Sequence, residues 1–184
     1  MSKKIRPWLQ NLKEYGLLKD NIMKSITIIR HAESDWTSNI DFERPLTHVG
    51  IDDAKIMGNT LINKKINLDI IISSPANRAI TTAGIIADQI QFKGKIKDEQ
   101  YIYGASSEKL FDMLTKLDNS FNSVGIVGHN PTLHILSEKL CNKQFMHFPT
   151  CSIVKINFNV KLWNNITIGE LEYFIFPEAC KVTN

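Results

Sequence analysis

Cysteine, arginine and long apolar runs are all scarce in this sequence, and each scarcity excludes a class of protein. Three cysteines without metal-ligand spacing argue against a disulfide-rich secreted fold and a cysteine-bound zinc site. No apolar run approaches the ~20 residues of a membrane-spanning helix, so we expect no membrane partner. The basic N-terminus continues into Pro7-Trp8 rather than an apolar core. We therefore expect no secretory signal and a cytoplasmic protein.

The positive charge of the chain comes almost entirely from lysine. The net charge of +3 is too small to predict a nucleic-acid partner. Of 22 basic residues only four are arginines, namely Arg6, Arg30, Arg44 and Arg78. Arginine can hold a phosphate with two parallel hydrogen bonds, which lysine cannot reproduce. Each arginine is therefore a candidate for a specific task.

The 184 residues suit one domain with one core. Residues 1–24 resemble a separate N-terminal extension, in which apolar residues at helical spacing could form a short amphipathic stripe. We assign residues 25–184 to a single domain.

Alternating strand and helix patterns follow the extension. Apolar runs predict buried strands at 25–29, 68–72 and 124–127, with a shorter strand at 95–98; helical spacing predicts helices at 48–64, 76–90, 107–117 and 131–141. Thr47 can cap the first helix, and Pro131 suits the first position of the last. Segments 152–158 and 170–176 alternate with period two and predict an antiparallel pair at the sheet edge. The expected fold is an α/β three-layer sandwich, with a mostly parallel central sheet flanked by helices.

Polar residues gather where three predicted strands end: Arg30-His31, Ser73-Ser74 leading to Arg78, and Gly128-His129-Asn130. Ligands of open parallel sheets bind beyond the carboxyl ends of the strands, so these segments should converge on one crevice. Arg44 lies within reach in the loop after the first strand. Two imidazoles among arginines fit a phosphoryl group.

Within such a crevice, a neutral imidazole can attack phosphorus while the second, if protonated, donates to a phosphate oxygen. Other interpretations are weaker. Ser73 and Ser74 fit turn or cap residues rather than nucleophiles. His129 has no carboxylate or cysteine at metal-ligand spacing, so we expect no metal. We expect His48 and His134 on the surface.

Three motifs carry a resemblance to a known family. Residues 28–34 (IIRHAES), 73–83 (SSPANRAITTA) and 128–131 (GHNP) resemble the signatures of the histidine phosphatase superfamily, the phosphoglycerate-mutase-like fold, in the family's order. Residues 44–47 (RPLT) are similar to a segment of the compact SixA-type phosphohistidine phosphatases. Ala32 stands where much of the superfamily has glycine.

The resemblance implies that His31 is the residue phosphorylated during the reaction. It also implies that Arg30, Arg78 and His129 complete the phosphate pocket. Three further residues are predicted to bind substrate: Arg44, Asn130 and Glu33. We expect no cofactor.

The substrate class is predicted from the lack of room for a sizeable insertion between His31 and Arg78. Relatives that act on small molecules carry their proton donor on an insertion, but one helix fills much of the stretch between His31 and Arg78. An open crevice suits a phosphorylated side chain of another protein. Phosphohistidine also releases an imidazole that is easily protonated, whereas an ester needs a positioned acid, for which the carboxylates available are Glu33, Asp35 and Glu99.

We therefore predict a phosphohistidine phosphatase acting on a phosphorylated protein, for which a histidine phosphotransfer domain is the family expectation. The alternative enzyme acts on small phosphate esters with the same nucleophile. A third possibility is a phosphate-binding module without turnover.

Overall fold

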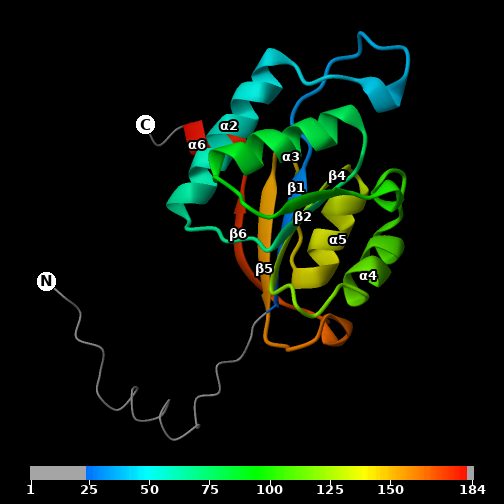
Figure 1. Ribbon diagram of the computed structural model, residues 1–184, viewed down its shortest axis with the longest axis vertical. Helices are drawn as coiled ribbons and strands as arrows, with labels where there is room; N and C mark the ends of the chain where they lie inside the picture. The colour runs from blue at the N-terminus through cyan, green and yellow to red at the C-terminus, as the bar shows by residue number, and fades with distance from the viewer. Residues whose placement is uncertain (1–23, 182–184) are drawn as a thin grey trace, which may run out of the picture.

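A six-stranded sheet forms the middle layer of the protein, which a computed structural model describes for residues 24–181 (Figure 1). In spatial order the strands are β3 (Lys95–Asp98), β2 (Ile70–Ser73), β4 (Ser123–Gly128), β1 (Lys24–Arg30), β5 (Ile153–Phe158) and β6 (Glu170–Ile175). The first four are parallel to one another, whereas β5 runs antiparallel to both β1 and β6. The predicted fold class, including its antiparallel C-terminal edge pair, is confirmed.

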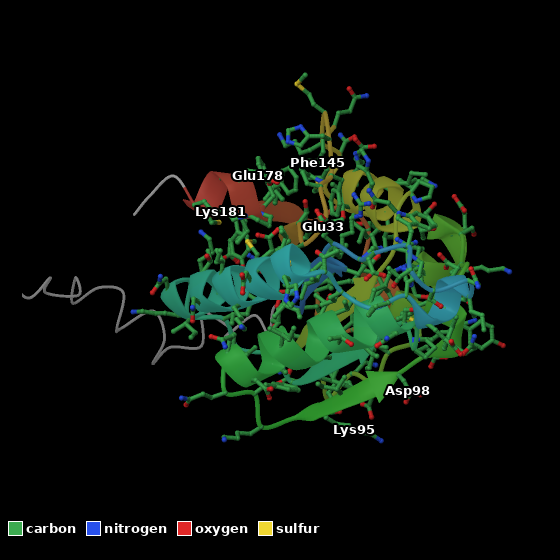
Figure 2. The ribbon with its side chains drawn as sticks, turned by 90° about the horizontal axis from the view of Figure 1, so that it is seen from above. Glu33, Lys95, Asp98, Phe145, Glu178 and Lys181 are labelled. Atoms are coloured by element: carbon green, nitrogen blue, oxygen red, sulfur yellow. The ribbon has the colours of Figure 1, made fainter. Side chains whose placement is uncertain are left out.

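Helices cover both faces of the sheet (Figure 1). They are α2 (His48–Asn63), α3 (Asn77–Gln89), α4 (Ser107–Thr115), α5 (Thr132–Cys141) and the short α6 (Pro177–Lys181). Three 3₁₀ turns lie in connections of the described chain: η1 (Asp41–Glu43) before α2, η2 (Gln100–Ile102) before α4 and η3 (Trp163–Asn165) between β5 and β6. Figure 2 shows β3, with its labelled Lys95 and Asp98, along one margin of the molecule.

The apolar strands are buried on both faces because each face has its own core. Ile28 belongs to the core under α4 and α5, whereas Ile29 belongs to the core under α2 and α3. Successive side chains of a strand point to opposite faces, so a fully apolar run supplies both cores at once. This explains why continuous apolar runs, rather than alternating ones, identified the parallel strands.

The N-terminus of α2 packs closely against the chain that follows β1. Thr47 caps the helix, as predicted, and its Oγ1 accepts from Gly50 N at 3.0 Å. Thr47 N donates to Glu33 O at 3.0 Å. A Cβ at Gly50 would overlap that same Glu33 carbonyl oxygen. The glycine is therefore required by close approach to the loop after His31.

Some predicted details differ in the structure. The helix expected from Pro131 begins at Thr132, and Pro131 is its N-cap after a cis peptide bond. His134 was expected on the surface, but it is half-buried: its Nε2 lies 3.0 Å from Phe145 O and its ring stacks on Phe148. His48 is exposed, as expected.

The predicted extension falls almost wholly outside the described residues. Only Lys24 is described, and it is the first residue of β1. The amphipathic stripe and the boundary of the extension therefore stay predictions. Within residues 24–181, every helix is too short or too polar to span a bilayer.

We expect Gly50→Ala to lower the free energy of unfolding by about 1–3 kcal/mol, because its Cβ forces α2 away from Glu33. Urea denaturation would measure the change. Gly84→Ala in α3 is the matched control, since a Cβ there meets no atom within 4 Å. That control should stabilise the helix slightly, by about 0.5–1 kcal/mol. Equal effects of the two substitutions would contradict the packing explanation.

Candidate active site

The carboxyl ends of β1, β2 and β4 bring the three predicted segments together. His31 N donates to Gly128 O at 2.9 Å, and Ser74 N donates to Val127 O at 2.9 Å, so the ladder continues just past the strand ends. The rings of His31 and His129 consequently face each other with centroids 5.2 Å apart.

These residues line an open cavity of about 330 Å³. It contains every predicted site residue: Arg30, His31, Glu33, Arg44, Arg78, His129 and Asn130, together with Ser34, Trp36 and Thr150. A larger hollow of about 610 Å³ beside α2 and α6 is lined by no histidine or arginine. The smaller cavity is therefore the candidate active site.

His31 is held as a neutral imidazole. Its Nδ1 lies 2.7 Å from Ala32 O, which can only accept, so Nδ1 carries the proton. Ala32 is fixed in turn because its N donates to Thr82 Oγ1 at 3.0 Å. Burial lowers the pKa of His31 to about 3, and the nearby Arg78 and Arg30 charges add to the lowering. Nε2 forms no hydrogen bond with the described residues, so its lone pair is available.

His129 presents its other face to the same cavity. Its Nε2 lies 2.8 Å from Ser74 Oγ, which already accepts from Ala76 N at 3.3 Å. With the Ser74 hydroxyl donating to Nε2, the ring proton lies on Nδ1. Nδ1 is buried without a partner. Burial, assisted by the Arg78 charge, lowers the pKa of His129 to about 4, so the ring is neutral near pH 7.

Arg30 and Asn130 are fixed by the segment that follows α5. Arg30 NH1 and Asn130 Nδ2 donate to the same carbonyl, Phe148 O, at 2.6 and 3.1 Å. His134 supports this segment through its contacts with Phe145 and Phe148. Figure 2 shows the labelled Phe145 on the same side of the molecule as α5. Arg30 Nε and Asn130 Oδ1 are left buried without a partner.

Arg78 is buried at the start of α3 and is held by Asp41. Its NH1 donates to Asp41 O at 2.6 Å and its NH2 to Asp41 Oδ2 at 3.0 Å. Arg78 Nε is buried without a partner. One edge of the guanidinium is thus bound to protein, while the Nε side is unused.

Arg44 lies in the cavity wall, but its donors bind the loop that it belongs to. Nε donates to Asp35 O at 2.7 Å, NH1 to Asp41 Oδ1 at 3.0 Å and NH2 to Ser34 Oγ at 2.8 Å. Its guanidinium carbon lies 3.3 Å from the Trp36 ring centroid. Arg44 therefore holds the β1–α2 loop together, and direct contact with substrate stays a prediction.

Of the three carboxylates considered as acids, only Glu33 lines the cavity. Glu33 Oε1 accepts from Thr47 Oγ1 at 2.9 Å, beside the start of α2 (Figure 2). Asp35 Oδ1 accepts from Thr37 N and Oγ1. Glu99 pairs with Lys97 at 3.0 Å.

Sequence reasoning missed Asp41, Tyr103 and the hydroxyl of Ser74. Asp41 connects Arg78 to Arg44, and its Oδ2 also accepts from Tyr103 OH at 2.9 Å. Partial burial raises the pKa of Asp41, but the hydrogen bonds from Tyr103, Arg44 and Arg78 outweigh this effect and lower the pKa to about 2. The one sequence signal was its position three residues before Arg44, a spacing at which an ion pair forms.

Three unpartnered N–H donors characterise the site: Arg30 Nε, Arg78 Nε and His129 Nδ1. Buried polar groups without partners are rare and call for a ligand or ordered water. An anion with several acceptor oxygens, such as a phosphoryl group, can accept hydrogen bonds from these donors. Within residues 24–181, no cluster of three or more His, Cys, Asp or Glu side chains could hold a metal ion.

Comparison with known families gives a match to the model of the histidine phosphatase superfamily, branch 1, over residues 26–100. This segment includes Arg30, His31, Arg44 and Arg78. Over this segment the chain is similar to the histidine phosphatase superfamily. His129 lies beyond the matched segment, but the structure places it beside His31.

The proteins to which this chain is similar are distant from it in sequence. An uncharacterised protein of Mycobacterium tuberculosis is 26% identical over 110 residues, which cover 59% of this chain and 67% of that protein. The structure of the protein histidine phosphatase SixA complexed with tungstate matches with a TM-score of 0.75 and 22% identity, over 86% and 99% of the two chains. Phosphoglycerate mutase from Bacillus anthracis matches with a TM-score of 0.66 and 16% identity, over 83% and 93%. This chain shares one fold with these two solved structures.

The lowered pKa values of His31 and His129 predict that acid destabilises the protein. The unfolded chain takes up these two protons first, so the stability that they contribute is complete above about pH 6.5 and is lost as the pH falls towards 4. Urea denaturation at about pH 7 and about pH 5 would measure the loss. His31→Gln should reduce it, whereas His48→Gln, at an exposed position, should not. An unchanged loss in His31→Gln would contradict the buried neutral imidazole.

Proposed function

We propose that this protein is a phosphohistidine phosphatase that removes phosphate from a histidine-phosphorylated protein through a phosphorylated His31. The observation that carries the proposal is the unpartnered Nε2 of a neutral His31, facing a cavity that also contains three unpartnered N–H donors. The nucleophile and the anion donors thus belong to residues that line one cavity.

The reaction takes two displacements at phosphorus. In the first, the lone pair of His31 Nε2 attacks phosphorus, and the bond from phosphorus to the substrate imidazole breaks with its electron pair on the departing nitrogen. Arg30 Nε, Arg78 Nε and His129 Nδ1 donate to the phosphoryl oxygens as charge develops there. In the second, water attacks phosphorus, loses a proton to solvent, and releases inorganic phosphate and neutral His31.

The anion also changes the protonation of His129. Burial and Arg78 hold its pKa at about 4 while the cavity is empty. A bound dianion offsets the Arg78 charge and raises that pKa, because an opposite charge at short range favours the charged form. His129 can then donate as an imidazolium, which is the role predicted from the sequence.

The leaving group favours phosphohistidine. Asp41, held ionised with a pKa of about 2, has no proton to donate near neutral pH. Within the described residues, the connection from β1 to α2 contains only the single 3₁₀ turn η1 and carries no cap. An alkoxide leaves poorly without a positioned acid, whereas a departing imidazole can be protonated by solvent. The name of SixA, a protein histidine phosphatase with the same fold, supports this choice of substrate.

An exposed aromatic residue at the cavity supports a protein substrate. Trp36 lines the cavity and is 79% exposed, and Ile40 in the same loop is 55% exposed. Trp36 is stacked on Arg44, whose hydrogen bonds fix the loop. A rigid, exposed tryptophan is the kind of residue that anchors protein interfaces.

The competing candidate is a phosphatase of small phosphate esters, since Glu33 lines the cavity and could serve as an acid for such a reaction. The two candidates differ in which substrate is turned over faster.

We expect rapid release of phosphate from a histidine-phosphorylated phosphotransfer domain and slow hydrolysis of an aryl phosphate, with both lost in His31→Ala. Phosphate release would be measured on both substrates under the same conditions. His48→Ala is the matched control, because it removes an exposed histidine outside the cavity. Faster turnover of the ester would favour the small-molecule candidate, and full activity of His31→Ala would refute the assigned nucleophile.

We expect Trp36→Ala to reduce kcat/KM for the phosphorylated domain by about tenfold, consistent with the loss of one interface anchor. The loss of kcat/KM on the aryl phosphate should be clearly smaller, because that compound is too small to extend to the exposed Trp36 at the edge of the cavity. Tyr101→Ala is the control, since Tyr101 is 76% exposed and lines other hollows. Equal losses on the two substrates would show that Trp36 does not contact the protein substrate.

A further inference from the structure

Asp41 joins three separate segments of the chain at the edge of the active site. Its Oδ1 accepts from Arg44 in its own loop, and its Oδ2 accepts from Arg78 in α3 and from Tyr103 after η2. Its main-chain oxygen accepts a second bond from Arg78 at 2.6 Å. Although the Asp41 side chain is 47% exposed, both of its carboxylate oxygens accept hydrogen bonds from neighbouring side chains.

These contacts determine which edge of Arg78 is available. The planar guanidinium has one edge formed by NH1 and NH2, and another formed by Nε and the second hydrogen of NH2. Asp41 takes the NH1–NH2 edge with its main chain and its carboxylate. The Nε edge is the one left over, and Arg78 Nε is buried without a partner.

We propose that Asp41 is a positioning residue, which fixes Arg78 so that its Nε edge binds the phosphoryl group beside His31 and His129. This inference rests on the proposed function only for the identity of the substrate. Asp41 acts through Arg78 and takes no proton and forms no bond to phosphorus.

Tyr103 extends the same arrangement to the second histidine. Its hydroxyl donates to Asp41 at 2.9 Å, and its ring lies edge-on to His129 with centroids 5.6 Å apart. The ring also lies edge-on to Phe42, the residue after Asp41. Asp41 therefore fixes Arg78 and the ring that packs against His129 at once.

A different role for Asp41 would have the opposite effect on binding. A carboxylate on Arg78 and Arg44 could instead act as a competitor that must be displaced by phosphate. Removing a competitor would tighten phosphate binding, whereas removing a positioning residue weakens it. The charge of Asp41 is constant near neutral pH, so the comparison is not complicated by its titration.

The first experiment measures binding of inorganic phosphate by calorimetry to the full chain. We expect Asp41→Ala to raise the Kd about tenfold, since the loss of one charged partner typically costs a factor of this order. Asp41→Asn should raise it less, because its amide oxygen can still accept from Arg78, and Tyr103→Phe should raise it less, because both bonds from Arg78 to Asp41 remain. Asp112→Asn, which removes an exposed carboxylate paired with Lys116, is the matched control and should leave the Kd unchanged.

The second experiment observes Arg78 directly by NMR of the arginine Nε–H groups, which is practical because the sequence has only four arginines. Arg78→Lys identifies the signal. In the wild type, phosphate should shift this signal; in Asp41→Ala the signal should broaden and respond only at higher phosphate concentration. The signal also separates misfolding from misplacement, because Arg30 should keep its shift in a folded variant.

Tighter phosphate binding in the Asp41 variants, or an Arg78 signal unaffected by Asp41→Ala, would overturn the inference. Neither measurement requires turnover. A wild type that binds phosphate through Arg78 but does not hydrolyse phosphohistidine would refute the proposed function alone. Hydrolysis together with unchanged phosphate binding in Asp41→Ala would refute the role of Asp41 alone.

Discussion

The parallel pairing of β1 with β4 is the interaction on which the active site depends. Arg30 lies opposite Gly128 in the register, so the next residues along each strand are His31 and His129. A shift of one residue would turn Arg30, rather than His31, towards the second histidine, because successive side chains point to opposite faces. The register is fixed by both cores at once, since Ile28 and Ile29 are buried on opposite sides of the sheet.

The site contains buried polar atoms that have no hydrogen-bond partner among the described residues. A buried and a partly buried imidazole, both with lowered pKa values, lie beside two guanidinium groups that keep unpartnered Nε atoms. Such an arrangement costs stability in the empty protein. An anion removes that cost, because it supplies acceptors for the donors and offsets their charge. The main-chain carbonyl of Phe148 fixes Arg30 without neutralising it, whereas Asp41 holds Arg78 with both its main-chain oxygen and its carboxylate.

Most of the site could be predicted from the sequence because its residues follow strands. His31 and His129 end apolar runs, and the carboxyl ends of parallel strands must meet. The scarcity of arginine made Arg30, Arg44 and Arg78 conspicuous, and all three lie in the cavity wall. Their catalytic and binding roles stay predictions. Asp41, by contrast, was hidden among the other acidic residues of an irregular loop, since no periodicity relates a loop carboxylate to a helix 37 residues later.

The sequence by itself determined the order of the elements, the two-sided burial of the parallel strands and the convergence of two histidines and two arginines. These follow from local periodicity and from the rule that parallel strands share a carboxyl edge. Only the tertiary structure decided which nitrogen of each ring is available, which edge of Arg78 is open, and that the donors of Arg44 bind its own loop. Hydrogen-bond direction depends on partners that are distant in sequence, such as Ser74 for His129 and Asp41 for Arg78, and only the folded chain brings them within 3 Å.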